Sequence, residues 1–220
     1  MAERPSTIIV PFWSAVFGCL SYISLFWLFR KLFPRVRGSY LFVDYWVLLN
    51  TLGALTVLII ASWRIGKPVT WLFIIVMIYG YLRVFEIFVY QVNVLLFDEY
   101  RARKGGIEYK LRGYRRIVIL LIHNYFEVIF WFAIEYVFAV RGSLVQIKDT
   151  TLFGVLHESL LIMVTLSGDT LRPMHWTGLL ILLTQSGIGI FMTLLVLARF
   201  VSLLPRPQTM DEFEMPDTSK

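Results

Sequence analysis

The chain has 220 residues, of which 58% are hydrophobic and only 16% are charged, and its mean hydropathy is +0.70. This composition excludes an ordinary soluble domain and indicates a protein of the lipid bilayer. The net charge of +6 could suggest nucleic acid, but the basic residues lie in loops between apolar segments, where orientation in the membrane explains them, so no nucleic-acid partner is expected.

The first half of the chain contains three apolar segments of spanning length, at residues 7–29, 45–63 and 70–97. The first lacks the charged region and cleavage site of a signal peptide, so we expect it to be retained. The single cysteine, Cys19, lies inside it, so one chain offers neither a disulfide framework nor a cysteine metal site. Residues 1–97 are therefore expected to form an N-terminal region of three transmembrane helices.

A polar linker at residues 98–116 separates this region from the rest, with seven Lys/Arg against three acidic residues. We expect it to be solvated and cytoplasmic. A fourth span is expected at residues 117–140. The tail at residues 205–220 is polar and has no apolar period, so it is expected to be disordered.

The most informative stretch follows the fourth span. Residues 152–164 are apolar but only about half as long as a helix that crosses a bilayer. A polar turn at residues 165–170 follows, and then an apolar run at residues 176–200 that is long enough to span. Non-helical backbone at membrane depth persists only where it is buried in protein or lines a water-filled path. The order of half-span, turn and span therefore predicts a re-entrant loop beside a pore.

This arrangement resembles the pore module of the tetrameric P-loop cation channels, in which an outer helix, a short pore helix, a selectivity filter and an inner helix form one quarter of a pore. Gly168-Asp169 followed by Pro173 resembles the end of a potassium-channel filter and the proline beyond it, and Gly189 occupies the place of a hinge glycine. The resemblance implies an all-α integral membrane protein with five spans and a re-entrant pore helix and filter loop, whose pore module, residues 117–204, closes a pore as a homotetramer.

The filter departs from the family pattern. The family's Thr-Val-Gly-Tyr-Gly-Asp is replaced by the five residues from Thr165 to Asp169, one residue shorter and without the first glycine and the tyrosine. Val164-Thr165-Leu166 with the later Arg172-Pro173 also resembles the Thr-Leu filters of sodium and calcium channels, without their Glu/Asp-x-Trp. The expected permeant ion is a monovalent cation, either potassium selectively or potassium and sodium together. No cofactor or bound metal is expected.

The resemblance assigns a role to three groups of residues. The filter would consist of Thr165, Leu166, Ser167, Gly168 and Asp169. Its carbonyl and hydroxyl oxygens would replace water around an ion, and Asp169, repeated four times, would attract cations. As an alternative, Asp169 caps the turn by accepting backbone hydrogen bonds.

The filter support would be Glu158 and Arg172: Glu158 either braces the filter from behind or lies wetted at the outer entrance, and Arg172 pairs with Asp169 or Glu158. The inner-helix cavity and hinge would be formed by Thr184, Gln185, Gly187 and Gly189. As an alternative, these four are the small and polar packing residues of any helix bundle.

Further ionisable residues lie within the spans. His123 and Glu127 are four apart and share a helix face, so they could sense protons, bind a metal or contact a neighbouring helix. Arg83 and Glu86 are three apart and are expected to form an internal pair. A voltage sensor needs several Lys or Arg on one helix, and the third span has one.

Charge predicts the orientation. The loop at residues 30–44, the linker and the C-terminal end carry fourteen Lys/Arg, against six in the segments on the other side. By the positive-inside rule the former are cytoplasmic, which places the N-terminus outside and the filter on the outer face of a multi-pass protein.

Two other functions stay open. An intramembrane enzyme could use His157, Glu158, His123 or Asp169, although the chain has no His-Glu-x-x-His spacing and no nucleophile-base motif. A small transporter or accessory subunit is also possible, although the spans show no paired broken helices in matching halves. We expect a channel and no enzymatic activity.

Overall fold

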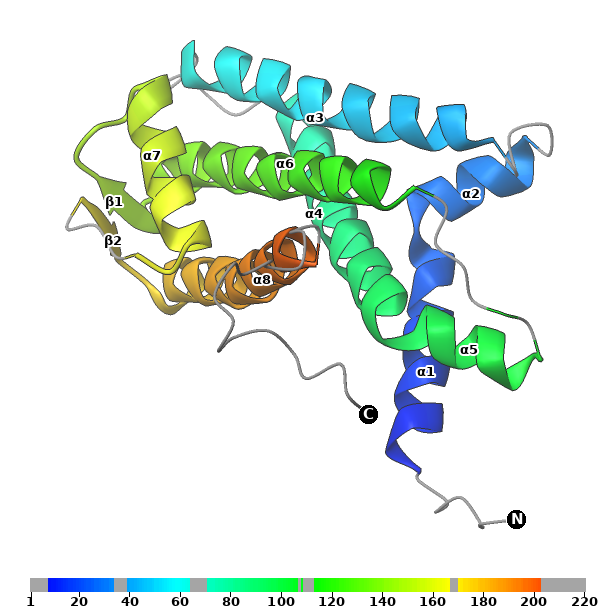
Figure 1. Ribbon diagram of the computed structural model, residues 1–220. Helices are drawn as coiled ribbons and strands as arrows, with labels where there is room; N and C mark the ends of the chain where they lie inside the picture. The colour runs from blue at the N-terminus through cyan, green and yellow to red at the C-terminus, as the bar shows by residue number, and fades with distance from the viewer. Residues whose placement is uncertain are drawn as a thin grey trace, which may run out of the picture.

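The computed structural model describes residues 8–33, 39–63, 71–106, 108, 113–166 and 170–202, and these residues are mostly helical (Figure 1). The elements in chain order are α1 (Ile9–Leu20), the 3-10 turn η1 (Ser21–Ile23), α2 (Leu25–Leu32), α3 (Tyr40–Trp63), α4 (Trp71–Val92), the π-helical turn η3 (Asn93–Phe97), α5 (Asp98–Lys104), α6 (Tyr114–Arg141), β1 (Val145–Ile147), α7 (Leu152–Met163), β2 (Leu171–Pro173) and α8 (Trp176–Val201). The disorder expected at residues 205–220 falls outside the described residues.

Four helices are long and apolar enough to cross a membrane: α3, α4 with its continuation through α5, α6 and α8. A fifth span results if α1 and α2 together count as one. The expectation of a mostly helical, multi-pass membrane protein is confirmed at this level. The linker predicted at residues 98–116 begins as the helix α5, which continues α4 beyond its π-helical turn.

The first span differs from the continuous helix predicted at residues 7–29. It is broken at Ser24, and the helical parts on either side of the break are bent by 66°. Ser24 adopts an extended conformation and its Oγ accepts a hydrogen bond from the amide of Trp27 at 3.1 Å. The Glu86 carboxylate of α4 accepts a second one from the amide of Phe26 at 3.0 Å. Because these groups satisfy the free amides of a new helix start, they stabilise the break.

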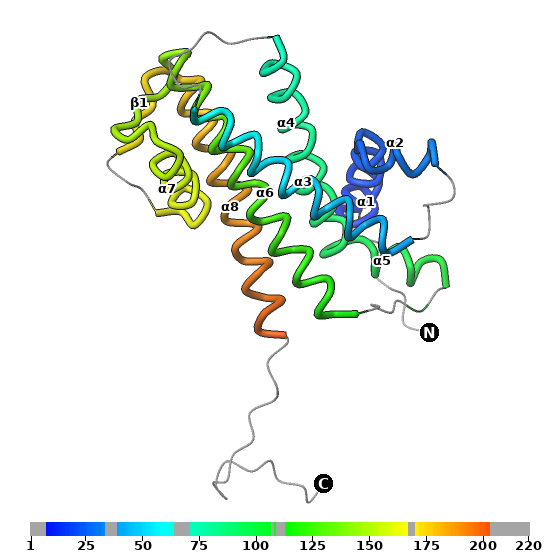
Figure 2. Tube along the Cα trace, turned by 90° about the horizontal axis from the view of Figure 1, so that it is seen from above, coloured from blue at the N-terminus to red at the C-terminus, as the bar shows by residue number. Residues whose placement is uncertain are grey.

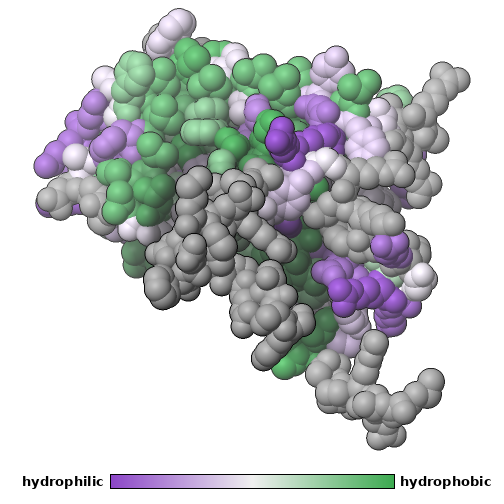
Figure 3. Space-filling view, in the orientation of Figure 1, coloured by the Kyte–Doolittle hydropathy of each residue, from purple (hydrophilic) through white to green (hydrophobic). Residues whose placement is uncertain are grey.

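The ends of the spanning helices are joined by contacts on two sides of the molecule. At one end, Arg116 near the start of α6 pairs with Asp44 of α3 at 2.6 Å, and the hydroxyls of Tyr114 in α6 and Ser202 after α8 form a hydrogen bond. At the other end β1 and β2 pair as a two-stranded antiparallel sheet between α6 and α8. Hydrophilic side chains gather over these ends, with hydrophobic surface between them (Figure 3). This is the distribution that a bilayer requires.

Helix α6 occupies the centre of the molecule. It packs against α3, α4, α7 and α8, and α3, α6 and α8 run side by side in both views (Figures 1 and 2). Its residues Val128, Ala133, Ile134 and Tyr136 are completely buried. Helix α7 packs against α6 and α8, so its contacts with these two helices determine its position.

Candidate functional site: the re-entrant segment

The start of α7 is fixed by a tight local structure. Thr151 caps the helix, its Oγ1 accepting from the amide of Gly154 at 3.2 Å, and Asp149 accepts from the amide of Thr151 at 2.9 Å. This backbone hydrogen bond lowers the pKa of Asp149 below its ordinary value, because it stabilises the carboxylate. A Cβ on Gly154 would lie 2.2 Å from the carbonyl oxygen of Asp149, so only glycine fits there.

The other end of α7 lies deep beside α8. A Cβ on Gly189 would lie 2.4 Å from the carbonyl oxygen of Met163, the last residue of α7, and Thr193 donates to that same oxygen at 3.4 Å. Gly189 is about 20 Å along α8 from Trp176, at about 1.5 Å per residue. The end of α7 therefore meets the middle of a helix that is itself long enough to span.

A buried hydrogen-bond network holds α7 to α6 and α8. Gln185 of α8 donates through Nε2 to the carbonyl oxygen and the Oγ of Ser159 in α7, at 2.8 and 2.9 Å. Tyr136 of α6 donates to Gln185 Oε1, and Ser159 Oγ donates to the carbonyl oxygen of Ile129 at 2.7 Å. Since both ends of the Gln185 amide are bonded and the side chain is 0% exposed, the network rigidifies the contact of the three helices.

The four residues expected together at the inner-helix cavity and hinge lie on two different faces of α8. Gln185 uses its amide inside the chain, and Gly189 serves close packing against α7. Thr184 and Gly187 lie on the opposite, exposed face of α8, where nothing approaches within 4 Å of a Cβ placed on Gly187. In a single chain, therefore, only Thr184 and Gly187 remain available to water or to a second copy.

Helix α7 ends in a strained turn. Thr165 has a φ of +61°, in the left-handed region that residues other than glycine seldom adopt, and its side chain and that of Leu166 are exposed. The amides of both residues still donate to carbonyls of α7, that of Leu166 to Leu161 at 2.8 Å. Of the expected filter, Ser167, Gly168 and Asp169 fall outside the described residues.

Glu158 lies beneath this turn. Its side chain is 4% exposed, and it accepts a hydrogen bond from Thr170 Oγ1 on the far side of the turn. His157, which is largely exposed, lies 3.4 Å from the same carboxylate oxygen. Glu158 is therefore buried within the chain and bonded to Thr170.

Arg172, the other expected support residue, lies in β2, where it is paired with Gln146 of β1. Its side chain is exposed, and among the described residues it forms no ion pair with Glu158. The alternative partner, Asp169, is outside the described range. The structure thus brings Glu158, but not Arg172, against the described part of the turn.

A second polar cluster, which we call the Arg83 cluster, joins α4 to α6. Arg83 donates from Nε and Nη2 to the two oxygens of Glu127, at 2.9 and 2.8 Å, and from Nη1 to Glu86. The internal pair expected of Arg83 and Glu86 is confirmed, and so is the contact of Glu127 with a neighbouring helix. His123 instead has its Nδ1 2.9 Å from the carbonyl oxygen of Ile119 in its own helix. The described residues contain no group of three or more His, Cys, Asp or Glu side chains placed to hold a metal ion.

Comparisons with protein-family models, with curated proteins and with solved structures found no match to this chain.

Sequence reasoning did not find the partners that hold α7. Ser159 and Tyr136 looked like ordinary helix residues, although a glutamine in an apolar span is a signal that some buried partner must exist. Gly178 was missed too: a Cβ there would lie 2.2 Å from the carbonyl oxygen of Leu144, so this glycine lets the start of α8 approach the backbone just before β1. Its signal was a glycine inside the first turn of a spanning helix.

Proposed function

We propose that this chain is one subunit of a homotetrameric channel for monovalent cations, with α6 as outer helix, α7 as pore helix and α8 as inner helix. The observation that carries the proposal is the depth of α7. Helix α7 has 12 residues, is about 18 Å long, and ends against the middle of α8. The chain next reaches β2, which pairs with β1 and lies just before the start of α8.

The return segment explains why a pore is proposed. Val164, Thr165 and Leu166 leave the helical conformation at a depth where, in a bilayer, water is absent unless a cavity provides it. An exposed stripe of α8 that includes Thr184 and Gly187 also has no neighbouring helix among the described residues. Four copies arranged around an axis would place this stripe against the partners and the pore, and would close a water-filled path beside the turn.

The filter we propose is the turn itself, with the oxygens of Thr165, Leu166, Ser167 and Gly168 facing the ion and Asp169 at the mouth. Glu158 would support the filter through its hydrogen bond with Thr170. The basic ends of α3 and α6 and the C-terminal end of α8 would lie in the cytoplasm by the positive-inside rule, with the N-terminus outside.

The decisive test is single-channel recording of the purified chain in planar bilayers, since resolved unitary currents exclude an enzyme or a transporter.

We expect poor discrimination between potassium and sodium, because the stack of carbonyl rings is shortened and lacks its first glycine. Reversal potentials under potassium/sodium gradients measure this. A strong preference for potassium would contradict the shortened filter.

The substitution Asp169→Asn should reduce the preference of the pore for cations over anions, because it removes a ring of four carboxylates that raises the local cation concentration. The measurement is the reversal potential in a salt gradient, and the effect should diminish at high ionic strength. The matched control is Glu99→Gln, an exposed acidic residue of α5 outside the turn that should leave the ratio unchanged. Equal effects of the two variants would remove the ring from the mechanism.

We also expect the open probability to depend only weakly on voltage. Arg83 is the only Lys or Arg in residues 40–63 and 71–97, and two carboxylates hold it, so it would move less than one net charge through the field, where one full charge corresponds to about 2.3 kcal/mol per 100 mV. Recordings in symmetric, blocker-free salt test this. A steep rise of the open probability over a few tens of millivolts would contradict this expectation, because it would show that several charges move through the field.

A further inference from the structure

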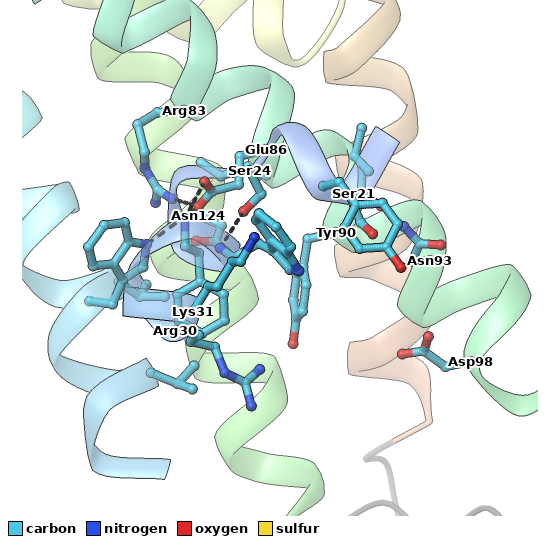
Figure 4. A pocket seen from close by; sticks show the side chains of 18 of the residues that line it. Ser21, Ser24, Arg30, Lys31, Arg83, Glu86, Tyr90, Asn93, Asp98 and Asn124 are labelled. Atoms are coloured by element: carbon cyan, nitrogen blue, oxygen red, sulfur yellow. Dashed lines mark hydrogen bonds and ion pairs between the residues drawn. The ribbon is translucent and has the colours of Figure 1, made fainter. Parts of the chain in front are cut away.

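A cavity of about 790 Å³ lies apart from the re-entrant segment, between the broken first helix and helices α3, α4 and α6. Figure 4 shows it from close by, with Arg83 and Glu86 near one end and Asp98 near the other. This volume is in the range of sites that hold small molecules. None of the residues proposed for ion conduction lines it.

The charges on its wall are unequal. The lining residues include four cations, Arg30, Lys31, Arg83 and Arg101, and two acids, Glu86 and Asp98. Glu127, which pairs with Arg83 from behind the wall, adds a third carboxylate, so the balance is one positive charge. Both acids already have partners. Glu86 accepts from Arg83 and from the amide of Phe26, and Asp98 pairs with Arg101 at 3.4 Å.

Lys31 is a cation of this wall without an ion pair among the described residues. It lies in the last turn of α2, is exposed, and has its Nζ 5.0 Å from the centre of the Trp27 ring. Among the described residues no carboxylate lies within 4.0 Å of it. The wall therefore presents a cation whose charge is not neutralised by the described part of the protein.

The rest of the wall is suited to an amphipathic molecule. Aromatic and aliphatic side chains form much of it, among them Tyr22, Phe26, Val43 and Ile87. One buried polar group is also unsatisfied: Asn124 is 4% exposed, and its Oδ1 has no hydrogen-bond partner among the described residues. Because buried amides are nearly always bonded, a donor from a bound molecule would complete this site.

We infer that this cavity binds one anionic phospholipid, with the phosphate beside Lys31 and the acyl chains along the apolar wall. Three observations favour a lipid over other ligands: the excess of positive charge, the apolar lining, and the position of the cavity at the basic end of a membrane protein. Basic pockets between transmembrane helices are suited to anionic headgroups. A headgroup that carries hydroxyl groups, such as phosphatidylglycerol, also supplies the donor that Asn124 lacks. This inference does not depend on ion conduction.

Native mass spectrometry of the purified full chain, with phosphatidylglycerol or phosphatidylcholine added to neutral detergent, measures the bound lipid. We expect one retained phosphatidylglycerol per chain and a preference over phosphatidylcholine of about fivefold, the effect of one basic residue near an anionic headgroup. Lys31→Gln should abolish most of this preference. Its matched control is Lys104→Gln, an exposed lysine of α5 that does not line the cavity and should leave the preference intact.

Three outcomes would overturn the inference. Equal retention of the two lipids would remove the anionic specificity. Equal losses in Lys31→Gln and Lys104→Gln would reduce the effect to general surface charge. Displacement of phosphatidylglycerol by millimolar inorganic phosphate would make the site one for a free anion rather than for a lipid.

Discussion

Gly189→Ala should lower the free energy of unfolding by about 1–3 kcal/mol, the usual effect of forcing one extra methyl group into a packed interior. The new Cβ would lie 2.4 Å from the carbonyl oxygen of Met163 and 3.0 Å from its Cα, which are backbone atoms that no rotamer change can move. Helix α7 would have to shift away from α8. In the proposed channel the same shift would displace the filter turn, so unitary conductance should fall as well.

The matched control is two residues away in the same helix. A Cβ on Gly187 meets nothing within 4 Å, so Gly187→Ala should be neutral or stabilise the helix by up to about 1 kcal/mol, because alanine is the better helix former. Equilibrium unfolding of both variants in detergent makes the comparison. Equal destabilisation would mean that α8 contacts a partner at Gly187, and equal tolerance would mean that α7 does not lie against Gly189.

The spans were predictable because their length and composition are set by the bilayer itself. The half-length of α7 was predictable for the same reason, since a 12-residue apolar helix cannot cross. The break at Ser24 was not. A serine in an apolar run is unremarkable, and the carboxylate that stabilises the new helix start belongs to Glu86, 60 residues away from its amide partner Phe26.

The candidate site was predictable in part. Arg83 and Glu86 are three residues apart, a spacing that places them on one face of a helix, but nothing local indicates that Glu127 joins them from 44 residues away. Thr184, Gln185, Gly187 and Gly189 were assigned together to a cavity and hinge, yet they divide between two faces of α8. In a helix that is apolar all round, the sequence pattern does not reveal which face is packed.

Arg83→Met should destabilise the chain by about 3–5 kcal/mol, because it leaves two buried carboxylates without their common partner. The side chains of Arg83 and Glu127 are 2% and 0% exposed, and Glu127 would keep only the indole N–H of Trp131, at 3.3 Å. Glu86 would keep the amide of Phe26 and the indole N–H of Trp46, but it would lose the guanidinium group that fixes its position, so the bend between α1 and α2 should loosen too. Equilibrium unfolding in detergent gives the size of the loss.

The control is a pair of the same chemistry on the surface. Arg103 and Glu99 of α5 are 77% and 54% exposed, and Arg103→Met should lower stability by no more than about 1 kcal/mol. The double variant Arg83→Met with Glu127→Gln should recover part of the loss, because it removes one of the two uncompensated charges. A double-mutant cycle measures that recovery as a coupling energy. Coupling near zero would show that Arg83 and Glu127 do not interact across α4 and α6, and the Arg83 cluster would then not be what joins the N-terminal helices to the proposed pore module.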